Sequence, residues 1–361
     1  MQSFPRHGSP LTATIGRRRL VYFLPLLALV PLLLASCTFG AKTTTSSSGG
    51  GLTQVKLALD WTPNTNHTGI YVAMAKGWYR QEGIDLQLLP YSSSIAPEQL
   101  VGTGQADFGI SFTEGVTSAR AAGEPIVSIA AIIQHNTSAL VTLKSSGLDT
   151  VATLAGKRYA GFGAPYEQPV IAQVLSCGGA KSVGFQNITT TLDPIAALKS
   201  GHFDFAWVFM GWEGIEAQEQ GIALNVFPLL GYCMPDYYSP VIITNQQLIH
   251  QNPNLITRFL KATAMGYSYA INHPKDAANL LIQGAPAGTF PDKQLVYDSQ
   301  NYLSPQYSAD AACWGVQTLD KWTNYPRFMY THNALTNVNG QPLTSPPDYA
   351  AAFTEQFLPK C

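Results

Sequence analysis

The sequence predicts an α/β protein built from two lobes, and three observations carry that prediction. Segments typical of strands alternate with segments typical of helices over residues 55–132, which favours a mostly parallel sheet. A second unit of the same kind spans residues 157–209. About 310 residues remain once the N-terminal region is set aside, which is more than a single hydrophobic core usually holds.

The elements of the first unit follow from apolar periodicity and from residues that start or stop helices. Lys76 and Gly77 end one predicted helix, and Pro97 fits the first turn of the next. The second strand alternates cleanly between apolar and polar residues. In order, the predicted elements are the strand 55–59, the helix 69–75, the strand 84–88, a helix from residue 96, the strand 107–110, the helix 113–122 and the strand 126–132.

Two extended segments, 139–143 and 240–244, are predicted to carry the chain between the lobes. Residues 53–141 together with 242–361 are therefore expected to form lobe 1, and residues 142–241 to form lobe 2. The part from residue 254 onward is predicted to be mostly helical and to pack on lobe 1. Ligands of open parallel sheets bind at the carboxyl ends of the strands, so side chains that follow strands are the candidates for a site.

The N-terminal region has the layout of an export signal, with Arg17, Arg18 and Arg19 before an apolar run over residues 20–34. A transmembrane anchor is the alternative. A bilayer span needs roughly 20 apolar residues, and Pro25 and Pro31 would break a helix this short. Residues 1–36 are accordingly predicted to be a signal peptide.

The apolar run ends in Leu34-Ala35-Ser36-Cys37, which resembles the lipobox of bacterial lipoproteins. Cys37 is the expected lipidation site, because acyl chains on one residue can hold a domain at a membrane without a spanning helix. Residues 37–52 are rich in Ser, Thr and Gly and are predicted to be a flexible tether. The expected location is extracytoplasmic, anchored to the cell membrane by the lipidated cysteine.

Composition excludes several functional classes. Charged residues make up 12% of the chain and the formal net charge is −1, whereas nucleic-acid binding needs a basic face. Four cysteines other than Cys37 permit disulfides outside the cytoplasm in three possible pairings: Cys177, Cys233, Cys313 and Cys361. None lies in a CxxC or a short Cys/His array, so neither a metal site nor a cofactor is expected.

Six motifs carry a family resemblance: residues 59–69 (LDWTPNTNHTG), 76–79 (KGWY), 104–109 (GQADFG), 205–207 (FAW), 211–216 (GWEGIE) and 236–241 (DYYSPV). In this order and spacing they resemble the solute-binding proteins related to thiamine-pyrimidine synthase, over nearly all of residues 55 to 325. The resemblance implies a type II periplasmic-binding fold, in which two α/β lobes joined by two hinge strands close on a ligand in the cleft.

The same resemblance implies a receptor that delivers a small heteroaromatic solute to an ABC permease and its ATPase. The implied solutes are hydroxymethylpyrimidine, formylaminopyrimidine or thiamine, and riboflavin stays open as an alternative. An aliphatic sulfonate would call for arginines at the cleft, where the candidate strand ends carry acids and aromatic residues. A monomer is expected.

The related synthase is an enzyme, and this chain departs from its pattern. The resemblance places Ser111 where the synthase has an aldehyde-binding lysine, and Gly115 where it has a sacrificial histidine. A hydroxyl cannot form a Schiff base, and a glycine cannot donate an imidazole. Another enzyme would need Cys177 or Cys233 with a histidine, and neither cysteine lies in a nucleophile elbow. No catalytic residue is therefore expected.

In lobe 1, four candidate ligand residues follow the first strand. Trp61 could stack on a flat ligand or lie in the core, and Asn66 could bind ligand or make a turn. His67 is either a donor at the ligand's rim or a helix cap. Tyr71 lies one helical turn later on the same face, where a core position is the alternative.

Three further lobe 1 candidates follow later strands. Ser111 ends the strand 107–110, and Glu114 lies in the first turn of the next helix, where the helix dipole alone could account for a carboxylate. Asn136 follows the strand 126–132.

In lobe 2, Trp207 and the Gly211-Trp212-Glu213-Gly214 motif follow a strand end. Trp212 is predicted to stack on the ligand and Glu213 to accept a hydrogen bond from an aminopyrimidine N–H, because charge-assisted hydrogen bonds are the strong ones. Tyr237 and Tyr238, beside the second predicted crossing, could cover the ligand on closure or pack the hinge. The turn 161–167 lacks a phosphate-loop pattern, and the role of Glu167 within it stays open.

Overall fold

A computed structural model describes residues 51–361. The predicted signal peptide, most of the tether and the lipidation site Cys37 lie outside the described residues. Within the described part, no helix has both the length and the apolar character needed to cross a membrane.

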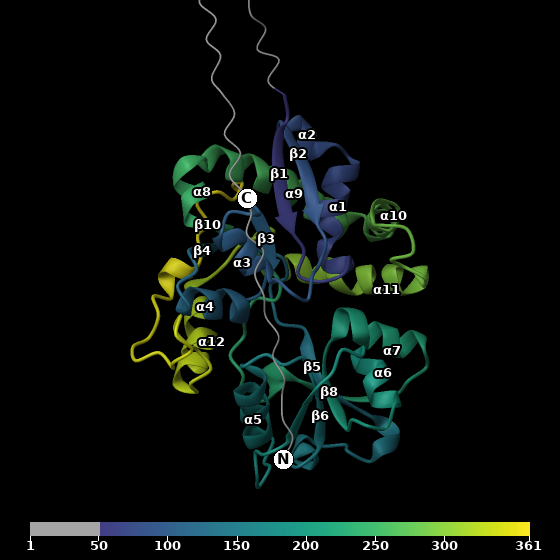
Figure 1. The fold of residues 1–361 in the computed structure, drawn as a ribbon. Helices are drawn as coiled ribbons and strands as arrows, with labels where there is room; N and C mark the ends of the chain where they lie inside the picture. Colours follow the sequence, from purple (N-terminus) through teal and green to yellow (C-terminus); the bar gives the residue numbers. More distant parts are fainter. Residues whose placement is uncertain (1–50) are drawn as a thin grey trace, which may run out of the picture. The chain divides into compact units, whose positions relative to one another are not determined.

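Two five-stranded mixed sheets form the framework (Figure 1). We call the first sheet and its helices lobe 1, and the second sheet and its helices lobe 2. The first sheet has the order β2 (Ile84–Leu89), β1 (Thr53–Ala58), β3 (Phe108–Ser111), β10 (Val241–Asn245) and β4 (Ile126–Ala131). The second has the order β7 (Gln186–Thr189), β6 (Arg158–Gly161), β8 (Phe205–Phe209), β5 (Ser138–Leu143) and β9 (Leu224–Pro228).

The two sheets repeat one topology, which confirms the predicted α/β fold class. In each sheet three neighbouring strands are parallel: β1 pairs with β2 and β3, and β6 pairs with β7 and β8. A strand that arrives from the other lobe then pairs antiparallel with two neighbours. That strand is β10 in the first sheet and β5 in the second.

Helices fill the connections and cover the sheets (Figure 1). The predicted helices after β1, before β3 and after β3 are confirmed as α1, α3 and α4, with Pro97 in the first turn of α3. The helices are α1 (Thr68–Ala75), α2 (Trp78–Gln81), α3 (Pro97–Gly102), α4 (Thr113–Ala121), α5 (Glu167–Cys177), α6 (Pro194–Lys199), α7 (Ile215–Glu219), α8 (Gln246–Gln251), α9 (Pro253–Asn272), α10 (Pro274–Gly284), α11 (Lys293–Leu303) and α12 (Leu319–Thr331).

Aromatic rings from helices pack directly on the strands. In lobe 1 the ring centroids of Phe108 on β3 and Phe259 on α9 lie 3.8 Å apart in a stacked pair. In lobe 2 the rings of Tyr159 on β6 and Phe205 on β8 lie 5.1 Å apart. All four side chains are fully buried, so each sheet has its own core.

The crossings between lobes lie in other residues than the sequence predicted. The segment 139–143 lies in β5, and residues 241–244 of the second predicted crossing lie in β10. The connections are the segments 132–137 and 229–240, which we call the first and second crossing. The prediction was wrong because both segments are apolar and extended, a pattern that fits a central buried strand as well as a hinge.

The sequence predicted that the C-terminal part packs on lobe 1, but this part packs on lobe 2 as well. Tyr325, Phe328 and Met329 of α12 belong to the lobe 2 core, together with Ala334 and Leu335. Trp322 of the same helix lies in a lobe 1 core cluster with Tyr238 and Ala352. Because α12 offers apolar side chains on more than one face, it contributes to the cores of both lobes.

Two disulfides settle the cysteine pairing. Cys177 at the end of α5 is bonded to Cys233 in the second crossing. Cys313 is bonded to Cys361, which ties the last residue of the chain to the segment before α12.

Candidate functional site

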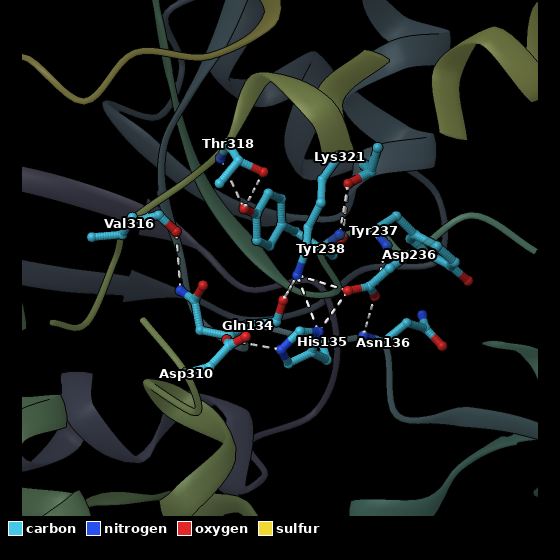
Figure 2. A network of polar contacts seen from close by, with 11 residues as sticks. Gln134, His135, Asn136, Asp236, Tyr237, Tyr238, Asp310, Val316, Thr318 and Lys321 are labelled. Atoms are coloured by element: carbon cyan, nitrogen blue, oxygen red, sulfur yellow. Dashed lines mark hydrogen bonds and ion pairs between the residues drawn. The ribbon is translucent and has the colours of Figure 1, made fainter. Parts of the chain in front are cut away.

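The two crossings are held together by one partly buried network (Figure 2). Asp236 of the second crossing accepts hydrogen bonds from the backbone N–H of Asn136 at 3.0 Å and of Tyr237 at 2.9 Å. Its other oxygen lies 2.6 Å from His135 Nδ1 and 2.7 Å from Lys321 Nζ of α12. Burial raises the pKa of Asp236, but the hydrogen bonds from Lys321, Asn136 and His135 outweigh it and leave the pKa below its ordinary value.

Glu114, in the first turn of α4, lies beside Tyr237 and Tyr325, which neighbour this network. Its Oε1 accepts a hydrogen bond from the Tyr325 hydroxyl of α12 at 3.2 Å, and its Oε2 has no partner among the described residues. The Tyr237 ring stacks on Tyr325 with centroids 3.9 Å apart. Burial raises the pKa of Glu114 to about 7, although its hydrogen bonds oppose that rise. Among residues 51–361 this buried carboxyl group has no counter-ion.

Aromatic side chains of lobe 2 continue the surface from Glu114. Tyr166, just before α5, lies with its ring 6.3 Å from Trp207 of β8 and 6.1 Å from Phe112, which precedes α4 in lobe 1. Phe162 lies 6.0 Å from Trp207 and is half exposed. The pKa of Tyr166 is raised well above its ordinary value, first by burial and then by the Glu114 carboxylate. Aromatic faces and a carboxylate thus lie together where the lobes meet.

Four buried polar atoms without a partner among the described residues belong to this region. They are Glu114 Oε2, Asn136 Nδ2, Trp207 Nε1 and the Tyr237 hydroxyl, and we call these four residues the interlobe polar cluster. They come from lobe 1, the first crossing, lobe 2 and the second crossing. Figure 2 shows Asn136 and Tyr237 extending to the same side, away from the network around Asp236. Other such atoms belong to Ser118, Trp314, Gln317 and Tyr349.

Buried polar groups in folded proteins almost always find partners, so a group of orphans marks a place where partners come from outside. The cluster offers one carboxylate acceptor, one amide donor, one indole donor and one phenol. Within residues 51–361, no lysine or arginine forms an ion pair with Glu114. The arrangement therefore suits a ligand that donates N–H groups to an acid and accepts hydrogen bonds elsewhere.

Two of the predicted site residues have their polar atoms occupied by neighbouring groups. His67 is fully buried, with Nδ1 accepting from Asn64 N–H at 3.3 Å and Nε2 lying 2.8 Å from Asp60. It closes a capping box with Asn64 before α1. Ser111 donates a hydrogen bond to the buried Glu98.

Glu213 and Tyr71 are also contacted by other residues of the chain. Glu213 lies in a π-helical turn and accepts a hydrogen bond from Phe209 N–H at 2.9 Å. Burial raises the pKa of Glu213 to about 7, against the opposing effect of that hydrogen bond. Tyr71 packs with Ala278, Leu281 and Val296 of α10 and α11, and burial raises its pKa to about 12.

The remaining predicted residues differ in exposure. Trp61 is half exposed and lies against Tyr91, with ring centroids 4.7 Å apart. The carbonyl of Asn66 accepts a hydrogen bond from the Tyr267 hydroxyl at 2.7 Å. Tyr238 is buried, and its hydroxyl accepts a hydrogen bond from Thr318 N–H at 2.9 Å.

Trp212 lines a cavity between α7 and the loop before α11. The cavity has a volume of about 240 Å³ and is also lined by Glu216, Glu219, Phe290 and Asp292. The Trp212 ring meets Phe290 edge to face at 6.2 Å. Because α7 belongs to lobe 2 and α11 to lobe 1, Trp212 lies where the two lobes meet.

Sequence reasoning missed Tyr166, Tyr325 and Glu98. Tyr325 comes from α12, 211 residues after Glu114, so nothing local announced the contact. Glu98 follows Pro97 in the first turn of α3, where an acid is favoured by the helix dipole and attracts no notice. A signal was present only for Tyr166, because it lies in the glycine-rich turn after a strand.

Within the described residues, no group of three or more His, Cys, Asp or Glu side chains is placed to hold a metal ion.

Comparison with solved structures defines the fold. The alkanesulfonate-binding protein SsuA from Xanthomonas axonopodis pv. citri superposes with a TM-score of 0.61 and 14% identity, covering 84% of this chain and 99% of that one. The fold of this chain is therefore the periplasmic binding protein fold that the resemblance implied. The NMT1/THI5-like family model matches residues 64–277, more than half of the chain, and the chain belongs to that family.

Curated relatives include both binding proteins and an enzyme. The formylaminopyrimidine-binding protein of Halalkalibacterium halodurans is 25% identical over 311 residues, 86% of this chain and 93% of the relative. The riboflavin-binding protein RibY of Chloroflexus aurantiacus is 27% identical over 355 residues, 92% and 96% of the two chains. The 4-amino-5-hydroxymethyl-2-methylpyrimidine phosphate synthase of Legionella pneumophila is 27% identical over 252 residues, 68% and 78%.

Proposed function

We propose that this chain is the extracytoplasmic solute-binding protein of an ABC importer and binds a thiamine pyrimidine precursor between its lobes. The observation that carries the proposal is the interlobe polar cluster, whose four unpartnered atoms come from both lobes and both crossings. A ligand bound by residues of both lobes stabilises the closed arrangement, and a permease can recognise that state.

The chemistry of the cluster matches an aminopyrimidine. The exocyclic amine donates to Glu114 Oε2, while ring nitrogens or a hydroxymethyl or formyl oxygen accept from Trp207 Nε1 and Asn136 Nδ2. Tyr166 and Trp207 offer aromatic faces for the ring. Glu213 and Trp212 remain candidates for a second contact, because one Glu213 oxygen alone is used by Phe209 N–H.

The relatives support a binding role. The formylaminopyrimidine-binding protein shares nearly its full length with this chain. By the same reasoning the partners are a permease and its ATPase, and the location is the outer face of the cell membrane, where a lipid on Cys37 would anchor the chain. The protein acts as a monomer in this proposal.

The synthase relative is the main competing class, and the geometry around Gly115 argues against it. A Cβ atom at Gly115 would lie 2.4 Å from Glu98 Oε1 and 2.9 Å from Ser111 Oγ. No histidine fits there without moving a buried carboxyl group. With serine at position 111, the chain also lacks the amine that a Schiff base requires. We therefore infer a receptor without catalytic residues.

Riboflavin is the second candidate ligand. RibY matches 92% of this chain, and an isoalloxazine ring would use the same aromatic faces and carboxylate. The two ligands differ in size: riboflavin has three fused rings and a ribityl chain, so it needs more room between the lobes than a pyrimidine does.

Isothermal titration of the full chain tests the proposal. The ligands are hydroxymethylpyrimidine, formylaminopyrimidine, thiamine and riboflavin, each titrated into the wild type, Glu114→Ala and Glu213→Ala. We expect one pyrimidine to bind with a micromolar or lower Kd, about 8 kcal/mol or more of binding free energy, and Glu114→Ala to abolish that binding. Binding of riboflavin alone would assign the chain to flavin uptake, and no binding of any of the four would end the vitamin proposal.

A further inference from the structure

The glycine-rich turn before α5 binds the carboxylate of one of the chain's own side chains. Three successive backbone N–H groups, of Phe162, Gly163 and Ala164, point at the Glu167 carboxylate at 3.0, 2.8 and 2.8 Å. The Tyr159 hydroxyl donates a fourth hydrogen bond to it at 2.7 Å. Glu167 is fully buried.

Such a turn is what proteins use to bind phosphate, sulfate or carboxylate ligands, because the N–H groups converge and the helix dipole favours negative charge. Here α5 is a helix of 11 residues, and the carboxylate of its own first residue takes the place of the ligand. All three backbone donors of the turn are satisfied, so none remains for an anion from solution.

The filled turn borders the proposed ligand site. Phe162 and Tyr166, on either side of it, lie 6.0 and 6.3 Å from the Trp207 ring. Tyr166 also faces Glu114, Glu167 and Glu98, whose charges, after burial, raise its pKa well above the ordinary value. Among residues 51–361, neither a lysine nor an arginine pairs with any of these three acids.

We propose that Glu167 is a specificity-determining residue, a resident anion that makes the interlobe site reject phosphate esters and sulfonates and admit only uncharged or protonated ring compounds. The inference rests on the proposed function, and it holds for either candidate ligand. It selects the free pyrimidine over its phosphate ester, and riboflavin over riboflavin phosphate.

The physical reason is that an anionic solute gains no backbone N–H donor from this turn and lies near buried acids. Like charges brought together at an interface typically weaken binding by about a hundredfold or more. Removal of the Glu167 carboxylate reverses both effects, because it frees three converging N–H groups and deletes one of the charges.

Titration of the full chain with matched pairs of ligands tests this inference. The pairs are hydroxymethylpyrimidine and its phosphate, and riboflavin and riboflavin phosphate, with inorganic phosphate as a fifth probe. We expect the wild type to bind one free compound at least about a hundredfold more tightly than its ester. Glu167→Ala should bind the ester or inorganic phosphate about tenfold or more better than the wild type.

Asp204→Ala is the matched control. Asp204 is also a lobe 2 carboxylate that accepts a backbone N–H, from Arg158 at 2.8 Å, but it lies before β8, at the opposite end of the sheet from the turn. It should leave the preference for the free compound unchanged. Glu167→Gln, which keeps the shape and removes the charge, supplies a second variant if the alanine variant does not fold.

Three results would overturn the inference. The first is a wild type that binds an ester as tightly as the free compound, a result that needs no variant. A folded Glu167 variant that binds the free compound and keeps the full preference would show that another residue sets it, and an equal gain in Asp204→Ala would show that the effect is not specific. If none of the free compounds binds the wild type, the proposed function itself fails, which is a distinct outcome.

Discussion

The hydroxyl of Tyr325 donates to Glu114 across 211 residues of sequence, and the Tyr237 hydroxyl lies beside the same carboxyl group. One carboxylate oxygen thus has a partner from α12, while the other is buried without one. The Tyr325 hydroxyl positions the group, and the second oxygen is available to a ligand.

Glu114 should make the empty protein less stable as the pH rises. Burial raises its pKa from 4.5 to about 7, so between those values the folded state holds a proton that the unfolded state has lost. The free energy of unfolding therefore falls across this window and is level above it. The difference corresponds to roughly 3 kcal/mol. Glu114→Gln should be more stable than the wild type at pH 8 by up to about that amount and similar at pH 4.

Denaturant unfolding at pH 4, 6 and 8 checks this expectation. Glu213 has a pKa raised in the same direction, so Glu114→Gln should reduce the slope without removing it. An unchanged slope in a folded Glu114→Gln variant would mean that the carboxyl group is not sequestered as described.

Trp207→Phe should weaken ligand binding by about fivefold to tenfold, the effect of losing one neutral hydrogen bond while an aromatic ring stays in place. Trp314→Phe is the matched control, because Trp314 Nε1 is also buried without a partner but its ring stacks on Tyr267 in the lobe 1 core. Titration of both variants with the same ligand decides the matter. Equal losses would show that the Trp207 N–H does not contact the ligand.

Asp236→Ala should destabilise the fold by roughly 2–4 kcal/mol, since the partly buried Lys321 and two backbone N–H groups would lose their partner. The Asp236 pKa lies below its ordinary value, so its contribution is present above pH 3.8 and is lost as the pH falls through the lower folded value. Asp310→Ala removes an exposed contact to the same His135 and should cost less than about 1 kcal/mol. Thermal unfolding of the two variants measures both losses of stability. Equal losses would contradict the central role of Asp236 in the network.

The two disulfides should contribute similar amounts to stability. They close loops with sequence separations of 56 and 48 residues, and the chain-entropy model gives nearly the same value for both, about 4 kcal/mol each before strain. Paired serine substitutions, Cys177→Ser with Cys233→Ser and Cys313→Ser with Cys361→Ser, should both lower the unfolding midpoint in guanidinium chloride. A midpoint unchanged in either double variant would argue against that pairing.

The strands and most helices of lobe 1 were predictable because local patterns determine them. Clean alternation predicted β2, and Pro97 and Lys76-Gly77 predicted the ends of helices. The crossings were not predictable, because an apolar extended segment such as 139–143 has the same sequence pattern whether it connects two sheets or lies inside one. Only pairing with β8 and β9 distinguishes the two cases.

The candidate site was predictable in its residue types and less so in their partners. Glu114 and Asn136 follow strand ends, as expected of ligand residues, whereas Trp207 lies within β8. Their sequence context resembles that of His67 and Glu213, whose hydrogen bonds go to Asp60 and to Phe209 N–H. Whether a polar side chain is satisfied by its own chain depends on turn geometry and on remote helices, which no short motif encodes.

Because α12 has side chains in the cores of both lobes, the lobes are joined by three parts of the chain and not by the two crossings alone. Any opening motion must either carry α12 with one lobe or bend the chain on one side of the helix. The first route exposes Tyr325, Phe328 and Met329 if α12 stays with lobe 1, and Trp322 if it stays with lobe 2. The first route removes apolar surface from contact and so requires work in proportion to the area exposed. The apolar residues of α12 therefore oppose separation of the lobes and favour the state in which both cores are in contact with the helix.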